Sequence, residues 1–147
     1  ISMAKIGRVH VIPAMMQSDD VNMMAVASRN IVDAENYAKE LGIAKAYGSY
    51  EELLADPEIE AVYNPLPNHL HVPVTIQAME AGKHVLCEKP ISMNAAEAEK
   101  LIEVSKRTGK INLTLGNCLT YTKQVINHSD IVHCKSISIN IFQSQRS

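Results

Sequence analysis

Small residues near the start of the chain form the first segment that could bind a nucleotide. Ser2, Ala4 and Gly7 occupy the three glycine positions of the G-x-G-x-x-G motif. Lys5 and Ile6 separate the second position from the third. Small side chains let a backbone approach a pyrophosphate, whose charge is stabilised by the N–H groups and dipole of a following helix. Two of the three glycines are replaced, so this segment alone is equally compatible with an ordinary helix start.

A second candidate segment follows about 20 residues later, where dinucleotide-binding folds place the group that contacts the adenosine ribose. It consists of Ser28, Arg29 and Asn30. An acidic side chain here would accept hydrogen bonds from a free 2′-hydroxyl, whereas Arg29 offers a planar cation, and Ser28 a hydroxyl, to a 2′-phosphate. The segment therefore favours NADP over NAD. The alternative is that Arg29 is a solvated charge at the start of a helix.

The tripeptide Glu88-Lys89-Pro90 is the third candidate segment and the one that could take part in proton transfer. It follows a short apolar run over residues 84–87, and the loops that follow the strands of a parallel sheet form its ligand-binding edge. Lys89 could hydrogen-bond a substrate hydroxyl there, and burial or neighbouring positive charge would ease its deprotonation. In any other position the same tripeptide would be interpreted as a surface turn.

Predicted helices and strands alternate along the part of the chain that carries these segments. Apolar spacing and capping residues predict helices over residues 4–17 (with Pro13 at a bend or in a first turn), 30–41, 49–55, 70–81 and 94–108. Short apolar runs predict strands over residues 21–28, 44–47, 61–63, 84–87 and 111–115. Prolines force a loop over residues 64–68. The alternation predicts an α/β fold with a Rossmann-like, doubly wound parallel sheet.

The last part of the chain differs from the rest. Residues 1–117 form the predicted nucleotide-binding domain, whereas residues 118–147 are rich in Ser, Asn and Gln and show weak strand character only over residues 137–142. His128 and His133 in this part are not spaced to share one face of a helix. We interpret residues 118–147 as a divergent polar tail rather than a substrate-binding domain.

Composition limits the classes of partner. The chain has 147 residues and a net charge of -2, with acidic and basic residues interleaved, so it offers no basic stripe to nucleic acid or to a membrane surface. No apolar run approaches the roughly 20 residues that span a bilayer. The three cysteines form no C-x-x-C pair, which argues against a disulfide framework and a zinc site. We expect a cytoplasmic protein that binds a small molecule and no metal.

Over residues 1–117 the sequence resembles the glucose-fructose oxidoreductase, inositol dehydrogenase and MocA family, and within it the branch with NADP-dependent xylose dehydrogenases and dihydrodiol dehydrogenases. The segments that carry the resemblance occur in the family's order and are AKIGRVHVIPAM, AVASRN, YNPLPNHLHVPVTIQAMEAGKHVLCEKP and NAAEAEKLIE. The resemblance implies an enzyme that transfers hydride between a nicotinamide cofactor and a hydroxyl-bearing carbon of a sugar, polyol or dihydrodiol.

The resemblance also implies roles for individual residues. Lys89 would contact the substrate, and Glu88 would lie beside the nicotinamide. His71 would lie near the cofactor, although on its residue type alone it would be a histidine satisfied at a helix start. A loop would pass along the cofactor with Asn64, Pro65, Leu66 and Asn68.

Two departures from the family affect what this chain can do. The family's fold begins with a central strand before the glycine turn, and only Ile1 remains of it, so a gap is expected in the middle of the sheet. The family continues into an antiparallel-sheet domain that supplies a catalytic histidine and subunit contacts, and nothing after Asn117 resembles it. We therefore expect a fragment, inactive by itself, whose full-length parent could form oligomers through the second domain.

The leading functional hypothesis is an NADP-dependent dehydrogenase fragment. In it the Ser2 to Gly7 turn, Ser28 and Arg29 bind the cofactor, and Lys89 takes the substrate proton. One alternative is a non-catalytic NADP-binding module. Another is that the chain neither folds nor binds, which a thermal shift with and without NADP would reveal.

Overall fold

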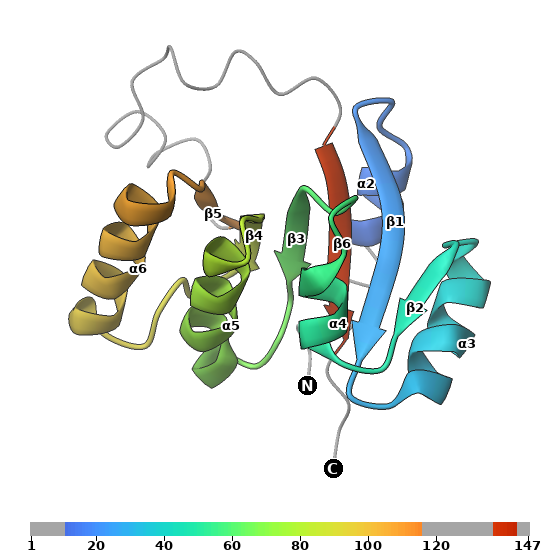
Figure 1. Ribbon diagram of the computed structural model, residues 1–147, viewed down its shortest axis with the longest axis horizontal. Helices are drawn as coiled ribbons and strands as arrows, with labels where there is room; N and C mark the ends of the chain where they lie inside the picture. Colours follow the sequence, from blue (N-terminus) through green and yellow to red (C-terminus); the bar gives the residue numbers. More distant parts are fainter. Residues whose placement is uncertain (1–10, 116–136, 144–147) are drawn as a thin grey trace.

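Six parallel strands in the order β2-β1-β6-β3-β4-β5 form the central sheet of the protein (Figure 1). The computed structural model describes residues 11–115 and 137–143. All neighbouring strands pair in parallel, which confirms the predicted α/β fold. The strands are β1 (Val21–Ser28), β2 (Lys45–Tyr47), β3 (Ala61–Asn64), β4 (His84–Glu88), β5 (Asn112–Leu115) and β6 (Ile137–Gln143).

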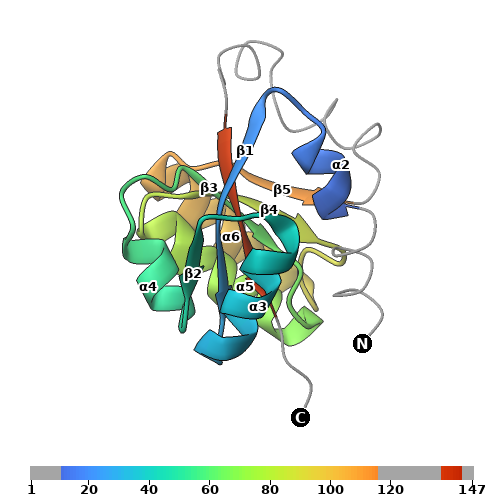
Figure 2. The ribbon, with the colours of Figure 1, turned by 90° about the vertical axis from the view of Figure 1, so that its right-hand side faces the viewer.

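Helices cover both faces of the sheet (Figure 2). On one face a core cluster joins the strands to α4 (Tyr50–Ala55), α5 (Asn68–Glu80) and α6 (Ala95–Thr108). On the other face a smaller cluster joins them to α2 (Ile12–Met16) and α3 (Ile31–Leu41). Side chains of successive strand residues point to opposite faces, so Val62 and Tyr63 belong to different clusters.

Helices α3, α4 and α6 begin at the capping residues that the sequence indicates. Asn30, Ser49 and Asn94 each accept a hydrogen bond from a backbone N–H in the first turn of the helix that follows. Gly42 and Gly109 end α3 and α6 with φ angles of 70° and 69°, a conformation that favours glycine. Of the helix predicted over residues 4–17, the described part is α2, with Pro13 in its first turn.

Strand β6 fills the place where the sequence predicts a gap. It pairs in parallel with β1, from Val21↔Ile137 to Ser28↔Gln143, and with β3, from Ala61↔Ile139 to Tyr63↔Ile141. The expectation of an empty central position is therefore wrong for this structure. The physical reason is that the backbone N–H and C=O groups of β6 supply the two ladders that β1 and β3 would otherwise lack.

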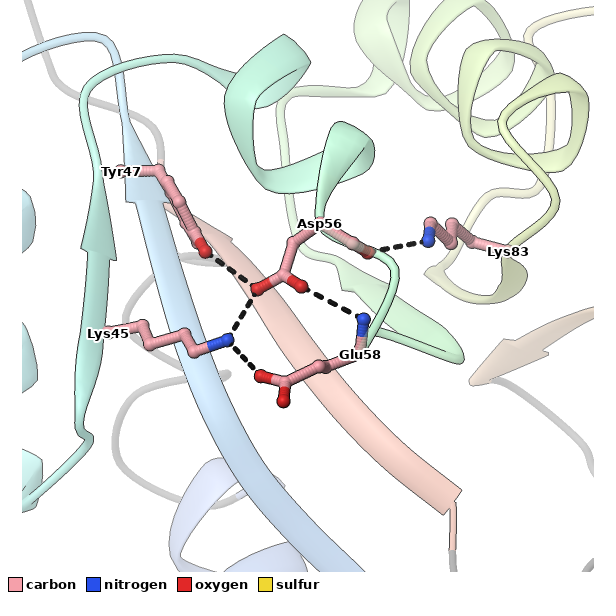
Figure 3. A network of polar contacts seen from close by, with 5 residues as sticks. All are labelled: Lys45, Tyr47, Asp56, Glu58 and Lys83. Carbon is pink, nitrogen blue, oxygen red and sulfur yellow. Dashed lines mark hydrogen bonds and ion pairs between the residues drawn. The ribbon is translucent and has the colours of Figure 1, made fainter.

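A charged network holds the edge of the sheet at the amino ends of the strands, which we call the amino edge (Figure 3). The carboxylate of Asp56 accepts hydrogen bonds from Lys45 Nζ and the Tyr47 hydroxyl, both at 2.7 Å, and from the Glu58 N–H at 2.9 Å. Lys45 also pairs with the Glu58 carboxylate. Lys83 Nζ donates to the Asp56 carbonyl at 2.7 Å. These contacts connect the segment before β3 to the starts of β2 and β4.

Candidate nucleotide-binding site

The opposite edge of the sheet, where β1, β3 and β4 end, brings most of the described candidate residues together. We call it the carboxyl edge. The strands end at Ser28, Asn64 and Glu88, and because they run in parallel, the segments that follow them emerge at this one edge. Arg29 and Lys89 therefore lie at the same edge of the sheet. The predicted contacts at Ser2, Ala4, Lys5, Ile6 and Gly7 lie outside the described residues.

Arg29 lines an open hollow beside the end of β1. Its side chain is exposed, whereas Ser28 is fully buried, with its hydroxyl accepting a hydrogen bond from the Asn30 N–H at 3.3 Å. Burial raises the pKa of Tyr50, and the positive charge of Arg29 opposes that rise. The hollow is lined by Arg29, Asn30, Ile31, Gly48 and Glu52.

Glu52 and Gly48 are residues of this hollow that the sequence did not indicate as a site. Ser49 and Glu52 have the spacing of a capping box, in which Ser49 accepts from the Glu52 N–H, and the Glu52 carboxylate accepts a hydrogen bond from the Gly48 N–H at 3.0 Å. The hollow thus contains one cation, Arg29, and one carboxylate whose orientation the backbone fixes. The capping pattern predicts where Glu52 lies along α4 but not that β1 ends beside it.

Asn64 is fully buried at the end of β3 and uses both ends of its amide within the protein. Its Nδ2 donates to the His71 carbonyl and to Thr75 Oγ1, each at 3.2 Å, and its Oδ1 accepts from the Leu66 N–H at 3.3 Å. Asn64 therefore shapes the loop over residues 64–68 and attaches it to α5. In this loop Pro65 and Leu66 are buried and Asn68 is partly exposed.

His71 lies in the first turn of α5 and is fully buried. Its Nδ1 lies 2.6 Å from the Pro90 carbonyl oxygen, and its Nε2 lies 2.6 Å from the Leu66 carbonyl oxygen. One side chain thus contacts both the loop after β3 and the loop after β4. The structure places His71 beneath these loops rather than at their surface.

Glu88 is buried at the end of β4, and its two carboxyl oxygens have different partners. Oε1 accepts a hydrogen bond from the Tyr63 hydroxyl at 2.5 Å, and Oε2 accepts from the Lys89 N–H at 3.3 Å. Burial, followed by the hydrogen bond to Glu88, raises the pKa of Tyr63 well above its usual value. The Lys89 side chain is exposed. A buried pair therefore holds the backbone from which the exposed lysine extends.

No pattern of residues indicates Tyr63 as part of the site. Tyr63 and Glu88 are 25 residues apart, and the strand register aligns Tyr63 with Leu86. A tyrosine whose side chain extends along the sheet can reach the next residue on the same face, which is Glu88. The pattern of two consecutive buried strands could have suggested that Tyr63 and Glu88 share a face, but not that they are hydrogen-bonded.

The described residues limit the other kinds of site. Within residues 11–115 and 137–143, no three His, Cys, Asp or Glu side chains are grouped so that they could hold a metal ion. No helix in the same ranges is both long and apolar enough to span a membrane. The described carboxyl edge has an exposed cation, Arg29 or Lys89, at each of two loops and buried polar side chains beneath them.

A doubly wound sheet with its candidate groups at the carboxyl edge defines the class of dinucleotide-binding domains. The model of the oxidoreductase family with an NAD-binding Rossmann fold matches residues 2–116. The chain belongs to this family, which comprises the glucose-fructose oxidoreductase, inositol dehydrogenase and MocA proteins.

Relatives with known names agree with the family. The chain is 46% identical over 106 residues to a D-xylose 1-dehydrogenase (NADP(+)) from Haloferax volcanii, covering 72% of this chain and 32% of that protein. It is 41% identical over 88 residues to a trans-1,2-dihydrobenzene-1,2-diol dehydrogenase from Xenopus tropicalis, covering 60% and 27%. Among solved structures, KijD10, a 3-ketoreductase from Actinomadura kijaniata in complex with NADP and TDP-benzene, superposes with a TM-score of 0.72 at 32% identity, covering 76% of this chain and 34% of that one. The chain thus spans about a third of the length of these proteins.

Proposed function

We propose that this chain is the NADP-binding part of a dehydrogenase that transfers hydride between the nicotinamide ring and a hydroxyl-bearing carbon of a sugar, polyol or dihydrodiol. The observation that carries the proposal is that Arg29 and Lys89 are both exposed and follow strands that end at the same edge of the sheet. A dinucleotide lying along that edge would have its adenosine ribose at Arg29 and its nicotinamide at Lys89.

The residues at the carboxyl edge fit such a cofactor. Arg29 offers a planar cation to a 2′-phosphate at an open hollow, and charge-assisted contacts of this kind are among the strongest hydrogen bonds. Ser28, which is buried, supports the Asn30 N–H behind it rather than extending into the hollow. The turn over residues 2–7 would bind the pyrophosphate, and the loop over residues 64–68 would pass along the cofactor.

The cofactor supplies the hydride chemistry when it is bound. Lys89 would hydrogen-bond the substrate hydroxyl and accept its proton as hydride leaves the same carbon. The Tyr63–Glu88 pair would orient the backbone of Lys89, because Glu88 Oε2 accepts from the Lys89 N–H. His71 is buried against two carbonyl oxygens, so Lys89 is the acid–base group that the loop over residues 88–90 exposes.

Exchanging Arg29 for Asp tests the cofactor assignment. The Arg29→Asp variant should weaken NADP relative to NAD by tens of fold, corresponding to about 2 kcal/mol for one charge-assisted contact. Isothermal titration calorimetry of the full chain with each cofactor would measure this ratio. Glu51→Gln, which changes charge on the neighbouring exposed face of α4, is a suitable control. An unchanged ratio of NADP to NAD affinity in the Arg29→Asp variant would contradict the assignment of Arg29 to the 2′-phosphate of NADP.

A second candidate function is an NADP-binding module without turnover. The burial of His71 favours it, because the histidine nearest to the loop of Lys89 along α5 has both ring nitrogens engaged within the protein. Following the absorbance of reduced cofactor, with NADP and a panel of aldoses and polyols, separates the two functions. We expect binding without robust turnover from the isolated chain, and robust turnover would contradict its inactivity.

A further inference from the structure

We propose that His71 is a positioning residue that fixes the two cofactor loops, residues 64–68 and residues 88–90, relative to each other. The inference rests on the proposed function only in taking these loops to contact the cofactor. The contacts of the His71 ring with the Leu66 and Pro90 carbonyls, which we call the clamp, do not depend on any ligand.

The contacts of His71 extend in two directions from a helix that cannot easily move. Helix α5 is buried along most of its length against β3, β4 and α6. From its first turn, His71 Nε2 reaches the Leu66 carbonyl, five residues earlier, and Nδ1 reaches the Pro90 carbonyl, 19 residues later. A side chain anchored on a rigid helix and bonded to two loops determines how far apart those loops lie.

The loop after β3 is held at both backbone groups of Leu66, its N–H and its C=O. The Leu66 N–H donates to Asn64 Oδ1, Asn64 Nδ2 donates to the His71 carbonyl, and the His71 ring contacts the Leu66 carbonyl. These contacts form a closed ring that joins the end of β3 to the start of α5. Buried polar groups in such a ring stabilise one loop conformation, because each broken contact leaves an unsatisfied group.

Both partners of His71 are carbonyl oxygens, which only accept hydrogen bonds. An imidazole ring carries at least one N–H, so His71 can donate to at least one of the two carbonyl oxygens that lie 2.6 Å from its ring nitrogens. The ring therefore connects to one loop by a hydrogen bond and lies against the other.

The loop after β4 has a second attachment that is separate from His71. Glu88 Oε2 accepts from the Lys89 N–H, and Tyr63 holds Glu88 from the neighbouring strand. His71 acts on the other side of Lys89, through the Pro90 carbonyl. Lys89 thus lies between two buried attachments, and loss of His71 should free its backbone on one side only.

Nitrogen-15 spectra of the histidine rings test the loop contacts without any substitution. In the full chain without cofactor, we expect a ring N–H of His71 that exchanges slowly with solvent, because the ring is buried and its nitrogens lie against loop carbonyl oxygens. His71→Gln identifies the resonance. A His71 ring without a slowly exchanging N–H would overturn the proposed contacts.

Amide exchange tests the positioning role. In the His71→Gln variant, whose side chain lacks the ring that joins the two carbonyls, we expect exchange of the Leu66 amide to rise roughly tenfold or more, and exchange of the Lys89 amide, which Glu88 still holds, to rise less. Thr75→Val is the matched control: it removes another buried hydrogen bond of the same helix, to Asn64, but neither loop contact of the His71 ring. Unchanged exchange of the Leu66 amide in His71→Gln would overturn the proposal. If that variant does not fold, the nitrogen-15 measurement still decides it.

The affinity for NADP gives a third test of the positioning role. If the wild-type chain binds NADP, the His71→Gln variant should bind it roughly tenfold more weakly, and Thr75→Val should bind it nearly as the wild type does. Absence of NADP binding by the wild-type chain would contradict the proposed function and leave the clamp to be judged by the amide exchange. Equal NADP affinities of wild type and His71→Gln would contradict the clamp alone.

Discussion

The two edges of the sheet differ in how far their polar side chains are exposed. At the amino edge, Lys45 pairs with the carboxylates of Asp56 and Glu58, whose side chains are 8% and 61% exposed (Figure 3). At the carboxyl edge, Asn64, His71 and Glu88 are at most 4% exposed, and most of their partners are backbone groups of the loops above them.

This difference in exposure indicates that the carboxyl edge holds its loops more firmly than the amino edge does. Exposed ion pairs contribute little to stability, because solvent screens them and the long side chains lose freedom. Buried polar groups are costly to leave without a partner, so they favour a single arrangement of the loops that satisfy them. The carboxyl edge thus fixes its loops through buried contacts alone, whereas the amino edge combines an exposed ion pair with two contacts to backbone groups, at the Glu58 N–H and the Asp56 carbonyl.

Matched tyrosine substitutions at the two edges should give the largest difference in stability. Tyr63→Phe removes the hydroxyl that donates to the buried Glu88, and we expect a loss of about 2 kcal/mol in the free energy of unfolding. Tyr47→Phe removes a hydroxyl that donates to Asp56, which keeps Lys45 and the Glu58 N–H, and we expect a loss below about 1 kcal/mol. Urea unfolding of both variants measures the difference. Equal losses would mean that the two edges are energetically alike.

A smaller effect is expected from the pH dependence of the amino edge. Hydrogen bonds from Lys45 and then Tyr47 lower the pKa of Asp56 from its usual 3.8 to about 2. Because the folded-state pKa is the lower one, the stability from Asp56 is fully present above about pH 4 and is lost as the pH falls toward 2. Lys45 is partly exposed, so we expect a loss of only about 1 kcal/mol over this range.

Asp56→Asn provides the comparison for that measurement. The variant should be less stable than the wild type near neutral pH, and the difference should shrink as the pH falls through this range. Thermal unfolding at several pH values, in low and high salt, would follow it. A difference that stayed constant with pH would show that the carboxylate charge of Asp56 does not stabilise the fold.

Much of the fold could be predicted because its signals are local. Asn30, Ser49 and Asn94 cap the helices that the sequence indicates, and the strands after them have short apolar runs. The place of β6 could not be predicted in the same way. Its strand character is visible in the sequence, but its insertion between β1 and β3 depends on what the remaining sheet lacks, and no local pattern encodes that.

The candidate site was predictable as a set of positions but not as a set of contacts. Asn64, His71 and Glu88 were singled out as neighbours of the cofactor, and the structure shows their polar atoms bonded within the protein. Residue spacing places them at one edge, but hydrogen bonds between residues 19 and 25 positions apart depend on strand register and side-chain conformation. Contacts of these residues with a cofactor remain part of the proposal.

The most direct test of the central claim is an amide chemical-shift titration of the full, nitrogen-15-labelled chain with NADP. The account predicts that the largest shifts fall at the carboxyl edge, at Arg29 and Asn30 and at Glu88 and Lys89, and that Lys45, Asp56 and Lys83 at the amino edge stay nearly unchanged. Shifts centred on the amino edge, or saturation of NADP binding with no shift at Arg29 and Lys89, would contradict it.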